Sequence, residues 1–246
     1  MVSDSNCRKG EIFKALYGVY CIIQEFEKLE QKARIRCAYE KQAGASRETV
    51  RACRKGLEKA GSIGEARSMI HKYRKQLEEL EVEVKRDPLR LLITGEIYTT
   101  IDTFGNHNIE ERLMDMGVAF EKRISVGWWL NRTVVNPFGG LISEKRRNQY
   151  MPHCIGGYAK ETVREAIRYQ KGGYDGIIQL LPVGCMPEIV AKSVFDGLGR
   201  DEGLPVLTII FDEMWGEAGY ITRIEAFVDL LTRKRGRGYG DTLFRN

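Results

Sequence analysis

The sequence predicts an α/β protein in which a helical N-terminal segment precedes a four-strand, doubly wound parallel sheet of the flavodoxin or Rossmann kind. Three observations predict this class. Residues 10–86 place apolar side chains at helical spacing, residues 89–235 alternate short apolar runs with helical patterns, and these runs are rich in Ile, Leu and Val on both faces. We therefore expect a helical segment at 1–88, an α/β domain at 89–235 and a flexible basic tail at 236–246.

The helical segment begins with two helical patterns. The first lies within residues 11–40, where six apolar residues at helical spacing predict a stripe that faces the core. These residues are Ile12, Leu16, Val19, Ile22, Ile23 and Phe26. The second helix is expected within residues 43–61, with Ser46 at its start and Gly61 at its end.

A third helix is expected within residues 64–86. It is strongly charged, so its His71 should lie on the surface. Asp87 then precedes Pro88, and a residue before proline is pushed out of helical geometry. We place the boundary of the helical segment at this dipeptide.

After Pro88 the chain alternates between strand and helix patterns. The expected strands cover residues 89–96, 118–126, 175–182 and 204–213. The expected helices cover residues 108–117, 160–173, 186–199 and 220–236. Asn108 and Glu111 have the spacing of a capping box, and Gly117 should end that helix. Residues 127–157 are expected to be irregular, apart from one short helix.

Charge and composition argue against several classes of function. The formal net charge is +5, but basic and acidic residues are mixed along most of the chain, which disfavours nucleic-acid binding. No stretch approaches the roughly 20 apolar residues that span a bilayer, and the N-terminus has no signal-peptide pattern. We expect a soluble, cytoplasmic protein that binds neither nucleic acid nor membranes.

The six cysteines have no C-x-x-C or zinc-finger spacing, and nothing indicates a secreted disulfide scaffold. Cys21, Cys37 and Cys53 fall in the helical segment, where each fits a small buried side chain.

The candidate functional residues lie in the loops after the strands, because ligands of open α/β sheets bind at the carboxyl edge. The loop after the first strand holds Glu96, Tyr98, Asp102, Asn106 and His107. The loop after the third strand holds Cys185 and Glu188. The loop after the last strand and the helix behind it hold Asp212, Glu213, Glu217 and Arg223.

Cys185 stands between an apolar run and a helix that begins with Met186-Pro187, and proline is favoured in the first turn of a helix. A thiolate there would face unpaired N–H groups and the positive end of the helix dipole, which predicts a lowered pKa. Such a thiolate suits metal ligation or nucleophilic attack. A buried cysteine in a turn explains the same pattern equally well.

Other chemistries have weaker support. A Cys/His protease needs a histidine within reach of the thiol, and only His107 and His153 lie in the α/β part. Zinc needs several Cys or His ligands, so one cysteine with these two scattered histidines is a weak signal. No G-x-G-x-x-G or P-loop pattern is present, so nucleotide binding has no fingerprint. The stretch "HCIGGYAKETV" offers an anion site at a helix start, a signal of low specificity.

The loops resemble those of a known superfamily. "GEIYTTIDTFGNHNIEERLMDMGV", "GGYAKETVREAI", "YDGIIQLLPVGCMPEIVAKSVF" and "PVLTIIFDEMWGEAGYITRIEAFVDLL" are similar to stretches of the 2-hydroxyacyl-CoA dehydratase D-component superfamily, in particular its acyl-CoA dehydratase activase-related branch. The resemblance covers residues 10–235, and the Cys-Met-Pro-Glu and Thr-Arg-x-Glu-Ala-Phe stretches are its most specific parts.

This resemblance implies an iron–sulfur protein that handles low-potential electrons, with one [4Fe–4S] cubane or a double-cubane cluster. It implies that Cys185 is a cluster ligand, with Glu188 beside it in the cofactor-binding stretch. Cys154 is a second candidate ligand. The remaining family ligands come largely from upstream segments that this chain lacks, so the cluster should be incomplete in the isolated chain.

Two functions remain open on these grounds. The chain is either an iron–sulfur component of a dehydratase or reductase system, completed by a partner polypeptide, or a binding and assembly module of the same fold without a cluster. In the first case the candidates to line the cluster or substrate are Glu96, Asp212, Glu213 and Arg223. Capping and salt bridging at strand ends would explain these four residues as well.

Assembly is expected in either case. A long helical segment beside a four-strand sheet leaves sheet edges and apolar helix faces to cover. Four aromatic residues fall in irregular segments near the expected ligand edge, where they fit either an interface or ordinary loop packing. They are Trp128, Trp129, Phe138 and Trp215. We expect a homodimer or a complex with a partner polypeptide, with residues 10–86 contributing.

Overall fold

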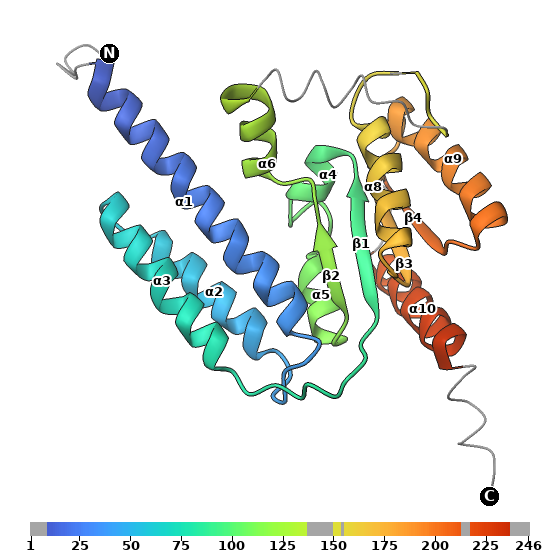
Figure 1. The fold of residues 1–246 in the computed structure, drawn as a ribbon, viewed down its shortest axis with the longest axis horizontal. Coiled ribbons are helices and arrows are strands. Elements are labelled where there is room, and N and C mark those ends of the chain that lie inside the picture. Colours follow the sequence, from blue (N-terminus) through green and yellow to red (C-terminus); the bar gives the residue numbers. More distant parts are fainter. Residues whose placement is uncertain (1–8, 137–149, 154, 213–216, 237–246) are drawn as a thin grey trace, which may run out of the picture.

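The computed structural model describes residues 9–136, 150–153, 155–212 and 217–236. The fold is α/β, as predicted, with a helical N-terminal segment and an all-parallel sheet of four strands (Figure 1). Phe138, Cys154, Glu213, Trp215 and the basic tail lie outside the described residues.

The strands follow the order β2-β1-β3-β4, which is the flavodoxin-like order. Their bounds are Arg90–Gly95 for β1, Ala119–Lys122 for β2, Gly176–Pro182 for β3 and Val206–Phe211 for β4. The chain leaves β1 toward β2 on one side and returns to β3 on the other, so the topological switch point lies between β1 and β3. All four strands were predicted. Residues 123–126 were wrongly included in the second strand, because Ser125 caps the helix that follows it.

Helices cover both faces of the sheet. One core cluster joins β1 and β3 to α8 (Ala159–Lys171) and α9 (Met186–Glu202). The other joins the strands to α5 (Ile109–Asp115), α10 (Glu217–Gly236) and the N-terminal helices. Along β1, Leu92 belongs to the first cluster, whereas Leu91 and Ile93 belong to the second. This alternation fits a strand buried on both faces.

The N-terminal segment is a three-helix arm, formed by α1 (Lys9–Arg36), α2 (Ala45–Leu57) and α3 (Ile63–Glu79). Figure 1 shows the arm beside β2, the strand at one edge of the sheet. His71 is exposed, as predicted. Cys37 and Cys53 are buried as predicted, but Cys21 is only half-buried.

The start of α2 differs from the expectation. The carboxylate of Glu40, itself buried, accepts hydrogen bonds from the backbone N–H groups of Gly44 (2.6 Å) and Ser46 (2.7 Å). The Ser46 hydroxyl therefore does not cap the helix, which starts at Ala45 and ends at Leu57 rather than Gly61. The capping group comes from outside the helix, so the local sequence pattern misses it.

The prediction of a core-facing stripe on α1 was right for its inner half and wrong for its outer half. Ile22 and Phe26 pack against the core. Ile12, Leu16 and Val19 are 47%, 65% and 51% exposed. For Ile12 and Leu16 the reason is length, because α1 has 28 residues whereas α3 has 17, so residues 9–17 extend past the start of α3, which packs on Gly18.

Three short helices complete the described fold. They are α4 (Ile97–Ile101), α6 (Val126–Leu130) and a π-helical turn, η1 (Asn131–Val135). The predicted capping box of α5 does not form, because Asn108 is in the left-handed region (φ 55°) and its side chain makes no capping bond. The Asn106 side-chain oxygen accepts from the Ile109 N–H instead (3.4 Å).

Candidate functional site

The loops after β1 and β3 meet at the switch point. The backbone N–H of Glu96 donates to the carbonyl of Leu180 (2.8 Å), so the chain after β1 is held against β3. Gly95 makes this contact sterically feasible. A Cβ added at Gly95 would lie 1.9 Å from the Leu180 oxygen, and its φ of 135° disfavours any residue with a side chain.

Cys185 occupies the position predicted for it. It is the N-cap residue of α9, partly exposed, with Pro187 in the first turn. The predicted lowering of its pKa is wrong, however. Burial raises the pKa of the Cys185 thiol, and the carboxylates of Glu188 and Glu96 raise it further, although the Glu188 backbone N–H opposes them. The thiol is therefore protonated at neutral pH unless a cation binds it.

Glu188 lies inside the protein, 1% exposed. Its Oε1 accepts from the Thr162 hydroxyl (3.1 Å) and its Oε2 from the Gln179 amide (2.9 Å), which also donates to the Glu188 carbonyl (2.9 Å). Burial raises the pKa of Glu188, against these hydrogen bonds. Glu188 thus ties the first turn of α9 to α8 and β3, and so fixes the backbone on which Cys185 stands.

The partners of Glu188 belong to a buried polar row that sequence reasoning missed. Thr94, Gln179 and Thr208 are register partners on β1, β3 and β4. The Thr208 hydroxyl donates to the Gln179 side-chain oxygen (3.0 Å), and the Thr94 and Thr162 hydroxyls lie 3.5 Å apart. The available signal was one polar residue inside each of three apolar runs, Thr94, Gln179 and Thr208.

Glu96 acts as a helix cap. Its carboxylate accepts from the N–H groups of Tyr98 (2.9 Å) and Thr99 (2.8 Å) and from the Thr99 hydroxyl (2.8 Å). Asp102 likewise accepts from the N–H groups of Phe104 (3.2 Å) and Gly105 (3.1 Å). The contacts of Glu96 are those of the capping alternative, and Glu96 is also close enough to Cys185 to raise the pKa of its thiol.

The other predicted residues gather less closely. Asn106 is buried, and its side-chain amide donates to the Thr99 carbonyl (3.0 Å). The His107 ring packs 5.4 Å from the ring of Tyr220 on α10. Asp212 is exposed directly after β4, and Arg223 is exposed on α10. Of the predicted set, the structure thus brings together Cys185, Glu188 and Glu96.

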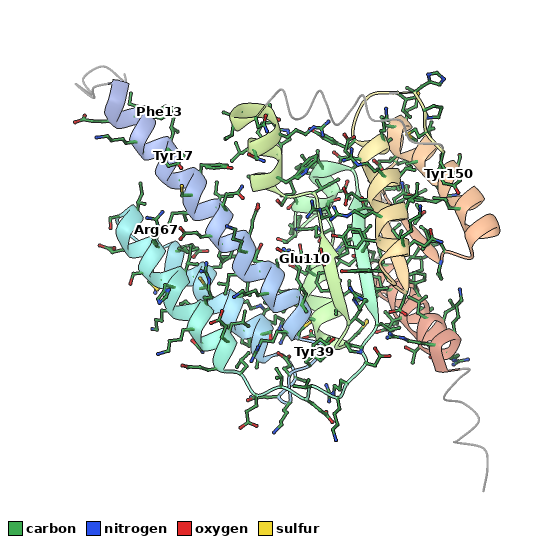
Figure 2. All side chains as sticks on the ribbon, in the orientation of Figure 1. Phe13, Tyr17, Tyr39, Arg67, Glu110 and Tyr150 are labelled. Atoms are coloured by element: carbon green, nitrogen blue, oxygen red, sulfur yellow. The ribbon has the colours of Figure 1, made fainter. Side chains whose placement is uncertain are left out.

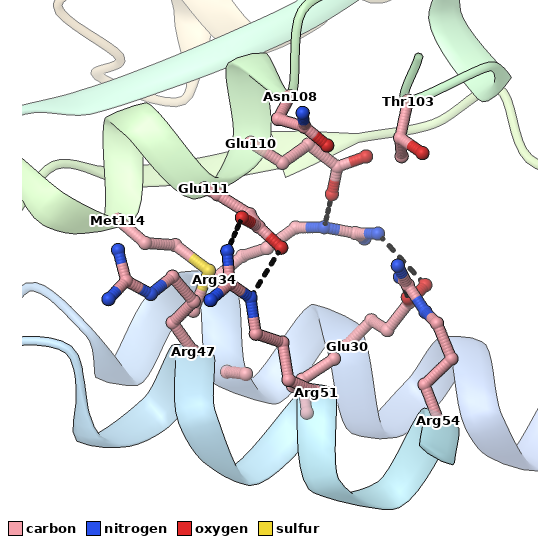
Figure 3. Close-up of a pocket in the computed structure, with 12 residues that line it drawn as sticks. Glu30, Arg34, Arg47, Arg51, Arg54, Thr103, Asn108, Glu110, Glu111 and Met114 are labelled. Atoms are coloured by element: carbon pink, nitrogen blue, oxygen red, sulfur yellow. Dashed lines mark hydrogen bonds and ion pairs between the residues drawn. The ribbon is translucent and has the colours of Figure 1, made fainter. Parts of the chain in front are cut away.

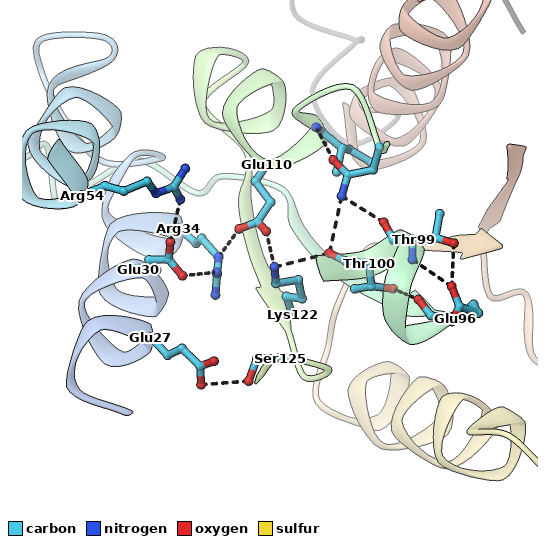
Figure 4. Close-up of polar contacts among 12 residues, drawn as sticks. Glu27, Glu30, Arg34, Arg54, Glu96, Thr99, Thr100, Glu110, Lys122 and Ser125 are labelled. Carbon is cyan, nitrogen blue, oxygen red and sulfur yellow. Dashed lines mark hydrogen bonds and ion pairs between the residues drawn. The ribbon is translucent and has the colours of Figure 1, made fainter. Parts of the chain in front are cut away.

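A second polar centre joins the arm to the α/β domain (Figure 4). Glu110 on α5 accepts from Arg34 of α1 (2.5 Å) and pairs with Lys122 at the end of β2. Although burial alone would raise it, these two cations lower the pKa of Glu110 to about 2. Glu30 extends the network to Arg34 (3.2 Å) and Arg54 (3.0 Å).

The cleft beside this centre is not a ligand pocket. Figure 3 shows Arg34, Arg51 and Arg54 beside the carboxylates of Glu110, Glu111 and Glu30. Arg47 pairs with Asp115, and Arg51 pairs with Glu111. Each arginine in the cleft therefore has an acidic partner within the chain, so the cleft is an interface between arm and domain.

Within the ranges that the structure describes, no group of three or more His, Cys, Asp or Glu residues has the geometry to hold a metal ion. No helix in those ranges is long and apolar enough to cross a membrane. Comparison with protein-family models and with curated proteins gives no match to this chain.

Proposed function

We propose that the protein is an iron–sulfur component of the 2-hydroxyacyl-CoA dehydratase or activase-related type, acting in low-potential electron transfer or dehydration. In this proposal it supplies Cys185 as one ligand of a cluster that a partner polypeptide completes. The observation that carries the proposal is the place of Cys185, half-exposed at a helix start on the switch point of a flavodoxin-like sheet. Ligands of such sheets bind at that point.

The described residues alone do not fit a whole cluster. A cubane needs about four ligands, mostly thiolates, whereas Cys185 is the one described cysteine at the carboxyl edge. Cys37 and Cys53 are buried in the arm, and Cys21 lies on α1. The missing ligands would have to come from another chain, with Cys154 as a further candidate. A reducing, cytoplasmic compartment suits such free thiols.

The buried row behind Cys185 supports a positioned ligand. Glu188, Gln179 and Thr162 fix the start of α9 through three elements, and a ligand held rigidly needs less ordering when its partner arrives. The raised pKa of the Cys185 thiol means that a cation must displace its proton, so cluster binding should weaken as the pH falls.

The test is anaerobic reconstitution of the full chain with ferrous iron and sulfide, alone and with proteins that co-purify anaerobically. Alone, the wild type should carry clearly less than one cluster per chain. With its partner, the iron and sulfide content should rise to stoichiometric, and Cys185→Ser should remove at least about half of it. Cys21→Ser, a half-buried cysteine of the arm, is the matched control and should leave the content unchanged.

The second candidate function is a binding and assembly module without a cluster. The contacts of Glu96 and Glu188 favour it, because the Glu96 carboxylate caps the backbone of α4 and the Glu188 carboxylate accepts from the Thr162 and Gln179 side chains. If a recovered partner binds wild type and Cys185→Ser equally, and neither complex contains iron, the iron–sulfur proposal fails and the assembly module stands.

A further inference from the structure

The outer half of α1 projects beyond the rest of the arm. At about 1.5 Å per residue, its 28 residues span roughly 42 Å, against roughly 26 Å for the 17 residues of α3. The first residue of α3, Ile63, packs on Gly18, where an added Cβ would lie 2.3 Å from its Cδ1. Residues 9–17 therefore extend past the start of α3, as Figure 1 shows.

This projecting half carries an apolar stripe in water. Phe13 is the most exposed of its residues at 71%, and Figure 2 shows Phe13 and Tyr17 on this outer half. At about 100° per residue, the stripe covers about 160° of the helix, on the side away from Gly18 and α3. Its residues are Ile12, Phe13, Leu16 and Tyr17 on the projection, and Val19 just beyond it on the same face of the helix.

The apolar surface continues onto α6 and η1. The Tyr20 hydroxyl donates to the Asn131 side-chain oxygen (3.4 Å), so η1 lies next to α1 just below the stripe. Four further exposed apolar residues follow on these two elements. They are Val126, Trp129, Val134 and Val135.

We propose that this surface, the α1 stripe with its continuation on α6 and η1, is the interface with a second copy of the chain. In the proposed dimer the two α1 projections pack antiparallel across a two-fold axis near Leu16. Each projection lies against the stripe and the α6–η1 surface of the other copy. This inference is independent of the iron–sulfur proposal.

The area meets what a stable dimer needs. With roughly 200 Å² for a fully exposed side chain of this size, the five stripe residues expose about 600 Å², and the four on α6 and η1 raise this to about 1000 Å². A standard interface buries about 800 Å² on each partner. Monomers rarely leave a contiguous apolar patch of more than a few hundred Å² in water, and the stripe alone exposes about 600 Å².

The surface is also self-complementary. Antiparallel helices align their dipoles favourably, and aromatic residues such as Phe13 and Tyr17 are enriched in interface cores. Helical spacing places Glu11 and Lys14 on the side away from the stripe, so pairing of two copies buries neither charge within it.

The test compares the full wild-type chain with Leu16→Glu, which puts a charge at the expected two-fold axis. Sedimentation and light scattering should give twice 28.1 kDa for the wild type at micromolar concentration, and a dissociation constant raised at least about 100-fold for the variant. Val84→Glu is the matched control, because Val84 is 81% exposed at the end of the arm remote from the α1 projection, and it should remain dimeric.

Disulfide trapping gives a second measurement that does not depend on a weakened dimer. Leu16→Cys should form an intermolecular disulfide with its own counterpart under mild oxidation, and Val84→Cys should not. A monomeric wild type overturns the proposal, as does a dimer that Leu16→Glu leaves intact or one that Val84→Glu disrupts equally. Recovery of a different protein on the stripe of a monomeric chain also overturns it.

Discussion

Single residues decide how closely the loops approach at the switch point, and Gly95 has the least freedom to change. Its positive φ and the nearby Leu180 oxygen leave no space for a Cβ. Gly95→Ala should therefore lower the free energy of unfolding by about 3 kcal/mol or more, through backbone strain and a forced separation of β1 from β3. Urea denaturation of the full chain measures this.

Gly197→Ala is the matched control for that substitution. Gly197 lies within α9, has no positive φ, and has open space where a Cβ would be added, so alanine should raise stability by up to about 1 kcal/mol. Equal effects of the two substitutions would contradict the role given to Gly95.

The sequence predicts the position of Cys185 but not the groups that surround its thiol. Pro187 marked the helix start, and the apolar run before Pro182 marked the strand, so the position of the thiol followed. The raised pKa of the thiol did not follow, because it depends on burial and then on the carboxylates of Glu188 and Glu96, which act through space. The burial of Glu188 depends on Gln179 and Thr162, which only the folded sheet brings to it.

Among the elements, the strands and most helices were predictable because their apolar periodicity is strong. The failures came where an element meets something distant in sequence. Glu40 caps α2 in place of Ser46. The Asn106 side chain accepts from the first turn of α5 in place of Asn108. The outer part of the apolar stripe on α1 was wrongly predicted to lie in the core, because the periodicity of one helix does not show how far a neighbouring helix extends.

The contact between the arm and α5 should make stability depend on acid pH. The folded pKa of Glu110 is about 2, below its ordinary value of 4.5, so its ion pairs stabilise the fold fully above about pH 4.5. That contribution, of the order of 3 kcal/mol, should be lost as pH falls through 2. Glu110→Gln should remove it at neutral pH, and the difference from wild type should shrink between pH 4.5 and 2.

Glu78→Gln provides the control for this pH profile. The Glu78 pair with Lys32 is about half exposed on both sides, so its loss should leave the free energy of unfolding close to the wild-type value. A wild-type minus Glu110→Gln difference that stays constant down to pH 2 would rule out the proposed role of the Arg34–Glu110–Lys122 centre.

For the whole molecule, the arm and the sheet share one side of the core. The cluster that contains Leu29 and Cys53 of the arm also contains Ile93 of β1 and Tyr220 of α10, without an interruption at Pro88. The ionic centre at Glu110 joins the same two parts. Contacts of this extent favour a single cooperative unit rather than an arm that melts by itself.

We therefore expect the full chain to unfold in one transition. Tryptophan fluorescence, to which Trp128 and Trp129 of α6 contribute, and far-ultraviolet circular dichroism, to which the arm contributes, should give the same midpoint. Leu29→Ala, at a residue of α1 with no exposed surface, should lower the free energy of unfolding by about 2 to 5 kcal/mol and shift both midpoints together. Val84→Ala, on the exposed end of the arm, should change it by no more than about 0.5 kcal/mol. Separate midpoints, with only the dichroism shifted by Leu29→Ala, would mean that the arm unfolds independently of the sheet.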